Sequence, residues 1–151
     1  MKNAVIINLD EALANSNHRK KLLEGRLKDW SQYFENAQRD TINPWCRALL
    51  YSVNSNNMAV LLFTCRPETY KDSTIKWLQN NKIHPFSYKL CMKPKECLSF
   101  QLGDVKKDVY NSLKEDFKVM FAVDSETKSW TDLGLVSLKV EEIEKPAGKT
   151  A

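Results

Sequence analysis

Three short runs of the sequence consist entirely of apolar residues, and they constrain the fold more than any other feature. Residues 4–7 read Ala-Val-Ile-Ile, residues 59–63 read Ala-Val-Leu-Leu-Phe, and residues 119–123 read Val-Met-Phe-Ala-Val. A strand with one face in water alternates apolar and polar side chains, whereas a strand covered on both faces does not. We therefore expect these runs to be buried strands of a parallel sheet.

Two further strands and five helices are expected around these runs. The strands cover residues 88–92 and 136–140, and the helices cover residues 20–34, 44–52, 69–80, 107–117 and 126–133. Strands that alternate with helices along the chain are typical of an α/β sandwich around a parallel sheet. The predicted fold class is therefore α/β, with a Rossmann-like, five-stranded parallel sheet flanked by helices.

The length of 151 residues and the apolar content of 42% are those of a single domain with one core. We expect residues 1–144 to form this domain and residues 145–151, which lack large apolar side chains, to form a flexible tail. The sequence shows no signal-peptide pattern and no apolar run near the roughly 20 residues of a membrane-spanning helix. A cytoplasmic protein without a membrane partner is expected.

The cysteines do not follow a zinc-binding pattern. No Cys-x-x-Cys pair occurs among Cys46, Cys65, Cys91 and Cys97, and the two histidines lie far apart in the sequence. Reduced thiols in the cytoplasm are the simplest interpretation. The formal net charge of +4 permits an anionic partner without requiring one.

Polar and charged side chains follow three of the predicted strands directly. They are Asn8 and Asp10, then Thr64, Cys65 and Arg66, and finally Asp124, Ser125 and Glu126, with Lys106 at the head of the preceding helix. The carboxyl ends of parallel strands meet at one edge of a sheet, and ligands bind there. Hydroxyl and cationic groups at this edge suit a phosphate group, because each phosphate oxygen needs a hydrogen-bond donor.

Each of these residues also has a structural explanation. Asp10 is compatible with a turn position and Asp124 with a helix cap. Thr64 is compatible with a strand-end hydroxyl, and Arg66 and Lys106 with solvated surface positions. Their joint placement at strand ends is what favours a functional site.

The order of these motifs resembles that of haloacid dehalogenase (HAD) superfamily phosphatases, in particular small phage and bacterial proteins related to the 3′-phosphatase domain of phage polynucleotide kinase. The family pattern Asp-x-Asp-Gly-Thr-Leu-Ala corresponds to residues 8–14, which are followed by the pair His18-Arg19. A Thr-Gly-Arg-Pro-Glu-x-Tyr pattern corresponds to residues 64–70. The resemblance covers residues 4–140 and implies the HAD fold with a minimal helical cap over residues 15–45.

The resemblance also implies roles for individual residues. Asn8 stands at the position of the nucleophile that attacks phosphorus, and Asp10 stands at the position of the residue that protonates the leaving group. Thr64 and Lys106 stand where the family holds the phosphoryl oxygens, with Arg66 beside them.

The nucleophile and the metal site depart from the family pattern. Magnesium is held in the family by the nucleophile, a backbone carbonyl and an acid at the position of Asp124, but Ser125 replaces a second acid and Asn8 is a neutral amide. Glu11 and Ala12 replace the usual glycine and threonine. An amide cannot form an aspartyl phosphate, and loss of a nucleophile costs about 10⁴–10⁶ in rate. We expect a nearly neutral pocket that needs no cofactor, with magnesium relevant only if activity survives.

Asn8 has two explanations from the sequence. It is either a natural change or an engineered Asp-to-Asn substitution of the kind used to trap a substrate. An engineered change would not account for Glu11, Ala12 and Ser125, so the natural change is the preferred explanation.

Three functions remain open from the sequence. The first is a catalytically impaired phosphatase-like protein, a pseudoenzyme that binds or regulates through a phosphorylated ligand, a nucleic-acid end or a protein partner. The second is an active magnesium-dependent phosphatase acting on nucleotides or polynucleotide 3′-phosphate ends. The third is a structural or assembly role without a ligand at the site. The changed motif positions favour the first.

The cap sequence contains two features that each allow two interpretations. The basic run His-Arg-Lys-Lys at residues 18–21 is either a solvated helix start or a contact for a nucleic-acid backbone. Trp30, Tyr33 and Phe34 either stack on bases or belong to the core.

Overall fold

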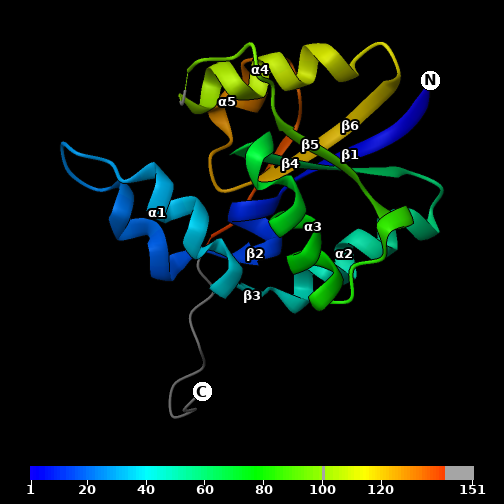
Figure 1. The fold of residues 1–151 in the computed structure, drawn as a ribbon. Helices are drawn as coiled ribbons and strands as arrows, with labels where there is room; N and C mark the ends of the chain where they lie inside the picture. The colour runs from blue at the N-terminus through cyan, green and yellow to red at the C-terminus, as the bar shows by residue number, and fades with distance from the viewer. Residues whose placement is uncertain (100, 142–151) are drawn as a thin grey trace.

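The structure of the protein is a computed structural model that describes residues 1–99 and 101–141. Its main feature is a five-stranded parallel sheet in the order β5-β4-β1-β6-β7 (Figure 1). The strands are β1 (Lys2–Asn8), β4 (Ala59–Pro67), β5 (Lys89–Lys93), β6 (Phe117–Asp124) and β7 (Ser137–Lys139). The predicted sheet is therefore confirmed, with β1 at its centre.

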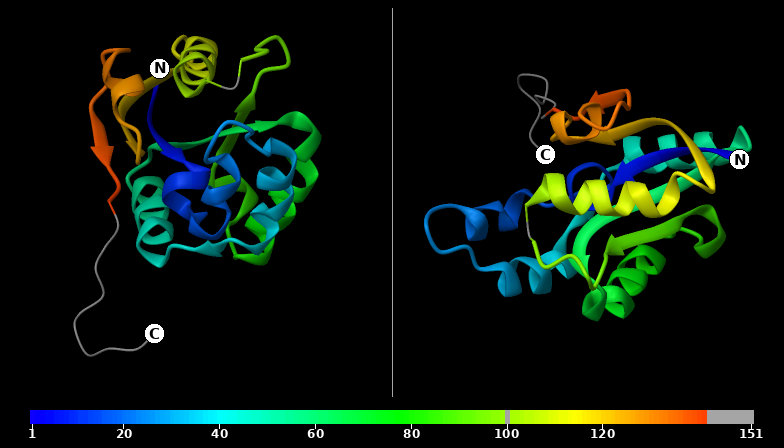
Figure 2. Two further views of the ribbon diagram at one scale, coloured as in Figure 1. Left: turned by 90° about the vertical axis from the view of Figure 1, so that its left-hand side faces the viewer. Right: turned by 90° about the horizontal axis from the view of Figure 1, so that it is seen from above.

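Helices cover both faces of the sheet (Figures 1 and 2). Apolar side chains of α2 (Pro44–Ser55) and α3 (Lys71–Asn80) pack on one face, and those of α4 (Leu102–Leu113) and α5 (Lys128–Thr131) pack on the other. Short 3₁₀ turns, η4 (Glu68–Tyr70) and η5 (Pro85–Ser87), lie before and after α3. The architecture is thus a three-layer α/β/α sandwich.

The central strand β1 is buried on both faces, which explains why its sequence shows no alternation. Val5 and Ile7 contribute to the core beneath α2 and α3. Ala4 and Ile6 contribute to the core beneath α4 and α5. All four side chains are at most 1% exposed. Their burial fixes the register of the strand, because a shift of one residue would exchange the two faces.

The predicted helix over residues 20–34 is wrong. The chain instead forms a 3₁₀ helix, η2 (Asn17–Leu23), then a loop, and then the short helix α1 (Trp30–Glu35). Gly25 has a φ of +82°, a conformation that other residues rarely adopt, and it interrupts any continuous helix. Asp29 then caps α1 by accepting a hydrogen bond from its first turn. These local signals override the leucine and aromatic periodicity.

The predicted helix over residues 107–117 is displaced along the chain. The observed helix α4 begins at Leu102 and ends at Leu113, whereas Phe117 opens β6 and pairs with Lys2 of β1. The last residue of the predicted helix, Phe117, therefore belongs to a strand, because it pairs with β1. Lys106 consequently lies within α4 and not ahead of it.

A small insert connects η1 (Leu9–Leu13), the turn after β1, to α2. A two-stranded antiparallel ribbon of β2 (Ala14–Asn15) and β3 (Thr41–Ile42) closes its base, and η2, α1 and η3 (Asn36–Arg39) form its body. The insert projects beyond the carboxyl ends of the strands (Figure 2).

Two sequence predictions concern the C-terminal tail and membrane-spanning helices. The predicted boundary at residue 144 and the predicted flexible tail over residues 145–151 lie outside the described residues. In the part of the chain that the structure describes, no helix has both the length and the apolar character required to span a membrane.

Candidate functional site

The candidate site lies at the carboxyl edge of the sheet, where β1, β4 and β6 end. The structure brings together there the residues singled out from the sequence: Asn8, Asp10, Thr64, Arg66, Lys106 and Asp124. They form two hydrogen-bonded groups. The Asp124 cluster contains Asn8, Lys106, Asp124, Glu126 and Trp130. The Asp10 cluster contains Asp10, Arg19, Thr64 and Arg66.

Asn8 ends β1 and caps the π-helical turn η1. Its Oδ1 accepts hydrogen bonds from the backbone N–H groups of Asp10 at 3.0 Å and Glu11 at 3.3 Å. Its Nδ2 donates to Oδ2 of Asp124 at 3.0 Å. A carboxylate at position 8 would face Asp124 as a like charge, whereas the amide supplies a hydrogen to it. The amide is therefore matched to its present neighbours.

Lys106 is fully buried, and its ammonium group contacts three acceptors. Nζ lies 2.9 Å from Oδ2 of Asp124, 2.7 Å from Oε2 of Glu126 and 2.9 Å from the Glu126 carbonyl oxygen. Three acceptors match the three hydrogens of an ammonium group. Burial alone would raise the pKa of Glu126, but the hydrogen bonds from Lys106 and Ser129 outweigh it, so the pKa lies below its usual value.

Asp124 is also fully buried and receives further hydrogen bonds. Nε1 of Trp130 donates to its Oδ2 at 2.8 Å, and the backbone N–H of Glu126 donates to its Oδ1 at 3.2 Å. Together with Asn8 and Lys106, these groups give Oδ2 three partners and Oδ1 one. The carboxylate is thus enclosed by protein donors.

Asp10 occupies the centre of the second cluster. Nε and Nη2 of Arg66 lie 3.0 and 2.8 Å from its Oδ1, and Nη2 of Arg19 lies 2.7 Å from the same oxygen. Oγ1 of Thr64 donates to Oδ2 at 2.6 Å. The side chain of Arg66 is held further by a hydrogen bond from Nη1 to Thr74 at 2.9 Å.

The surroundings of Asp10 keep it ionised. Burial alone would raise its pKa, but the charges of Arg66 and Arg19 and the hydrogen bond from Thr64 outweigh burial and lower the pKa to about 2. A general acid works best when its pKa lies near the operating pH. At neutral pH, Asp10 in this arrangement has no proton to give to a leaving group.

Arg19 is a site residue that the sequence does not single out. Its place in the basic run at residues 18–21 predicts a surface position, but its side chain is fully buried. Besides Asp10, it binds Asp40 through Nε at 2.9 Å and Nη2 at 2.6 Å, and its guanidinium lies 4.2 Å from the ring centroid of Tyr33. The His-Arg pair in the family pattern is the signal that points to it.

The surroundings of Arg19 show how the basic run and the aromatic residues of the cap are used. Nε2 of His18 lies 2.6 Å from Oδ1 of Asp40, so the basic run is only partly solvated. Tyr33 and Phe34 are each 4% exposed, and both belong to the core.

Glu11 and Ser125, two positions that depart from the family pattern, contact one another. Oγ of Ser125 donates to Oε2 of Glu11 at 3.1 Å. Burial of the Glu11 carboxyl outweighs the nearby charge of Lys20, and its pKa is raised. Ala12 is fully buried in the core and has no polar group to offer Asp10. Glu11 and Ser125 are thus hydrogen-bonded to each other.

The described residues of this site offer few oxygen ligands for magnesium. Within residues 1–99 and 101–141, no group of three or more His, Cys, Asp or Glu side chains is placed to hold a metal ion. Oδ2 of Asp124 already receives hydrogens from Asn8, Lys106 and Trp130. A hard divalent cation needs several oxygen ligands, and carboxylates are its main protein ligands. Asn8 is a neutral amide that donates a hydrogen bond to Asp124 and brings no carboxylate to the site.

Cys65, between Thr64 and Arg66, is not an activated thiol. Burial raises the pKa of its thiol to about 12. The thiolate is the reactive form of cysteine, and it is scarcely populated at neutral pH with such a pKa.

Replacing Asp10 with asparagine is expected to lower the free energy of unfolding by about 3–5 kcal/mol at neutral pH, because the buried guanidinium of Arg66 loses its counter-charge and that of Arg19 keeps only Asp40. The effect depends on pH. Since the pKa of Asp10 is lowered from 3.8 to about 2, its carboxylate stabilises the fold above about pH 4, and this contribution is lost as the pH falls toward 2. Urea unfolding of both proteins between pH 2 and pH 7 measures the difference.

Asp132→Asn is the matched control for this experiment. It makes the same chemical change in an exposed ion pair with Lys128, and exposed pairs contribute little to stability, so its urea midpoint should stay close to that of the wild type. If the difference in the free energy of unfolding between wild type and Asp10→Asn stayed constant across the whole pH range, Asp10 would not be the ionised partner described here.

Magnesium at 10 mM is expected to shift the thermal midpoint of the wild type by no more than about 2 °C, because a Kd of about 10 mM or weaker contributes at most about 0.4 kcal/mol. Asn8→Asp should melt at a lower temperature without magnesium, since it places a carboxylate beside Asp124, and magnesium should restore part of the loss. Differential scanning fluorimetry at constant ionic strength tests both. A magnesium-dependent rise of many degrees in the wild type would contradict the description of the Asp124 cluster.

Solved structures share this fold. A chain in "Structure of the Pnkp1/Rnl/Hen1 RNA repair complex" superposes with a TM-score of 0.71 and 23% identity over 93% of this chain, and this chain spans 42% of its length. A class C acid phosphatase from Bacillus anthracis gives a TM-score of 0.62 with 19% identity, over 86% of this chain and 54% of the phosphatase. A haloacid dehalogenase-like hydrolase from Streptococcus pneumoniae gives a TM-score of 0.59 with 11% identity, over 91% of this chain and 84% of the hydrolase.

No protein-family model matches the sequence, and a search of curated proteins finds no match. The structural likeness spans nearly the whole chain, while the chain itself spans less than two thirds of the first two similar structures. Because the order of strands, the site at their carboxyl edge and these superpositions agree, the chain has the haloacid dehalogenase-like hydrolase fold.

Proposed function

We propose that this protein is a catalytically impaired phosphatase-like protein that binds a nucleic-acid end or another phosphorylated ligand without hydrolysing it. The observation that supports this most directly is the hydrogen bond from Nδ2 of Asn8 to Oδ2 of Asp124 at 3.0 Å. In a phosphatase of this fold, the corresponding pair would be a nucleophile and a metal ligand. Here it is a closed contact between an amide and an acid.

Two further properties of the site support the loss of turnover. An amide oxygen is neutral and a poor nucleophile, so the covalent step that divides phosphoryl transfer into two easier steps is not accessible. Asp10 has a pKa of about 2 and no proton to donate at neutral pH. The loss of a nucleophile alone costs about 10⁴–10⁶ in rate.

The insert supplies the cations for ligand binding. Arg19 is buried, but Lys20, Lys21, Arg26 and Lys28 lie on η2 and the loop after it with at least part of each side chain in water; these four are called the basic insert segment. The segment belongs to the part of the chain that projects beyond the carboxyl edge of the sheet (Figure 2). Cations beside a site suit a polyanion, whose phosphates they neutralise. One structural neighbour belongs to an RNA repair complex, which favours a nucleic-acid end as the ligand.

Wild-type protein is expected to hydrolyse neither p-nitrophenyl phosphate nor a 3′-phosphorylated oligonucleotide above background, with or without magnesium. The reason is the missing nucleophile at Asn8. Phosphate release measured over hours, with folded protein verified by circular dichroism, tests this. Thr64→Val serves as the control, because it removes the hydroxyl at the site.

Turnover by the wild type that EDTA and Thr64→Val both abolish would contradict the proposal. It would establish the alternative, an active magnesium-dependent phosphatase acting on nucleotides or 3′-phosphate ends.

A single-stranded RNA decamer with a 3′-phosphate is expected to bind the wild type, and the double variant Lys20→Glu/Lys21→Glu should bind at least about tenfold more weakly. The affinity should also fall steeply with salt, because counterions are released on binding. Fluorescence anisotropy from 50 to 200 mM salt measures both effects.

Lys118→Glu/Lys114→Glu is the matched control, because both residues are exposed and lie toward the amino ends of the strands, away from the insert. If both double variants lost the same affinity for the RNA, binding would depend on net charge alone, and this would contradict a role for the basic insert segment. No binding to any oligonucleotide would favour a protein partner instead.

A further inference from the structure

The sheet has an unpaired edge at β5. This strand is the outermost in the order β5-β4-β1-β6-β7, and among the described residues it pairs with β4 alone. An unpaired edge carries free backbone N–H and C=O groups that can pair with another chain. The unpaired side of β5 faces away from β4, the strand that carries Thr64 and Arg66 of the Asp10 cluster.

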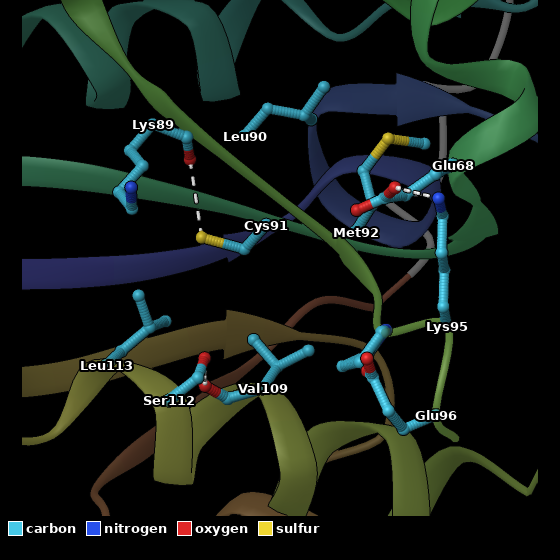
Figure 3. A pocket seen from close by; sticks show the side chains of 11 residues that line it. Glu68, Lys89, Leu90, Cys91, Met92, Lys95, Glu96, Val109, Ser112 and Leu113 are labelled. Atoms are coloured by element: carbon cyan, nitrogen blue, oxygen red, sulfur yellow. Dashed lines mark hydrogen bonds and ion pairs between the residues drawn. The ribbon is translucent and has the colours of Figure 1, made fainter.

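A groove of about 390 Å³ runs along this edge, between β5 and α4 (Figure 3). Four consecutive residues, 89–92, line it from the strand. Side chains of a strand alternate between its two faces. Four consecutive residues can therefore line one groove only if the backbone edge itself faces it.

The opposite wall of the groove comes from α4. Val109, Ser112 and Leu113 lie on one face of the helix, because residues three and four apart are neighbours there. Val109 and Leu113 are buried, as is Cys91 on the strand. The floor is thus apolar. Glu68 and Lys95 form an exposed ion pair at one end, with a distance of 3.9 Å (Figure 3).

A second copy of this chain is a poor occupant for this edge. Antiparallel pairing of two β5 strands centred on Cys91 would place each Lys89 opposite the other Lys93. Like charges directly opposite each other are destabilising. The formal net charge of +4 on each copy adds to this repulsion. Lys93 is buried and Lys95 is paired with Glu68, so the exposed Lys89 is the charge on the strand that favours an acidic residue of the occupant opposite it.

We propose that the β5 edge and its groove bind an extended acidic peptide of a partner protein, which adds as a sixth strand to the sheet. The peptide presents an apolar side chain opposite Cys91, where it enters the groove against Val109 and Leu113. An acidic side chain two residues away lies on the same face, opposite the exposed Lys89. Backbone hydrogen bonds supply affinity in such an arrangement, and alternate side chains supply specificity.

The test uses a fluorescein-labelled peptide of sequence Thr-Glu-Thr-Leu-Thr-Glu-Thr, whose symmetry suits either strand direction. It should bind the full chain saturably in fluorescence anisotropy. Hydrogen exchange should slow in residues 89–92 when the peptide is added. Two versions of the peptide, each N-methylated at one alternate set of residues, provide the decisive comparison. At least one version should bind more weakly than the unmethylated peptide, because methylation of the edge that pairs with β5 removes its hydrogen bonds in that strand direction.

Variants of the protein test the charge and the groove separately. Lys89→Glu should weaken binding about tenfold, and a peptide carrying lysine in place of glutamate should recover it. Ser112→Trp should block the groove, since Ser112 is exposed on the helical wall. Lys139→Glu makes the same charge change on β7, the opposite edge strand, and should leave the affinity unchanged.

Three results would overturn the proposal: no binding at millimolar peptide, undiminished binding of both N-methylated peptides, or a concentration-dependent dimer that protects residues 89–92 without peptide. None of these measurements depends on phosphate turnover or on oligonucleotide binding. The proposal can therefore fail while the proposed function stands, and the reverse is also true.

Discussion

The buried carboxylate of Asp10 is the interaction on which the arrangement of the site depends. Through Arg66 and Thr64 it joins the end of β1 to β4, and through Arg19 it joins both strands to the insert. Arg19 extends the connection to Asp40, just before β3. These charges are almost fully removed from water, so each is stable only while its partners remain in place.

In the Asp124 cluster, buried charge is balanced by different groups. Carboxylates at positions 8 and 124 would repel each other unless a cation lay between them. The amide of Asn8 removes one charge, and Lys106 places its ammonium group in contact with Asp124. The two clusters use many of the donors at the carboxyl edge for contacts within the protein. A ligand at this edge must therefore compete with internal partners, which is why the cations of the insert matter for binding.

The sequence predicted the sheet well because burial on both faces leaves a direct pattern in runs such as residues 4–7. It also placed Asn8, Thr64 and Asp124 at one edge, since the ends of parallel strands coincide. The helix over residues 20–34 failed because Gly25 and Asp29 act locally and override periodicity. Arg19 could not be separated from its basic neighbours by composition. The His18-Arg19 pair of the family pattern points to it, and its contacts with Asp10 and Asp40 explain its burial.

The burial of Arg19 also limits how chains of this kind can diverge. An exchange of the insert for a larger cap removes Arg19 and Asp40 together and leaves Asp10 paired with Arg66, whereas a transplanted insert carries the Arg19–Asp40 pair with it. Each part keeps its own charge balance, and what either recombination loses is the contact of Arg19 with Asp10 that joins the two parts. Arg19 and Asp40 are therefore expected to be retained or lost together.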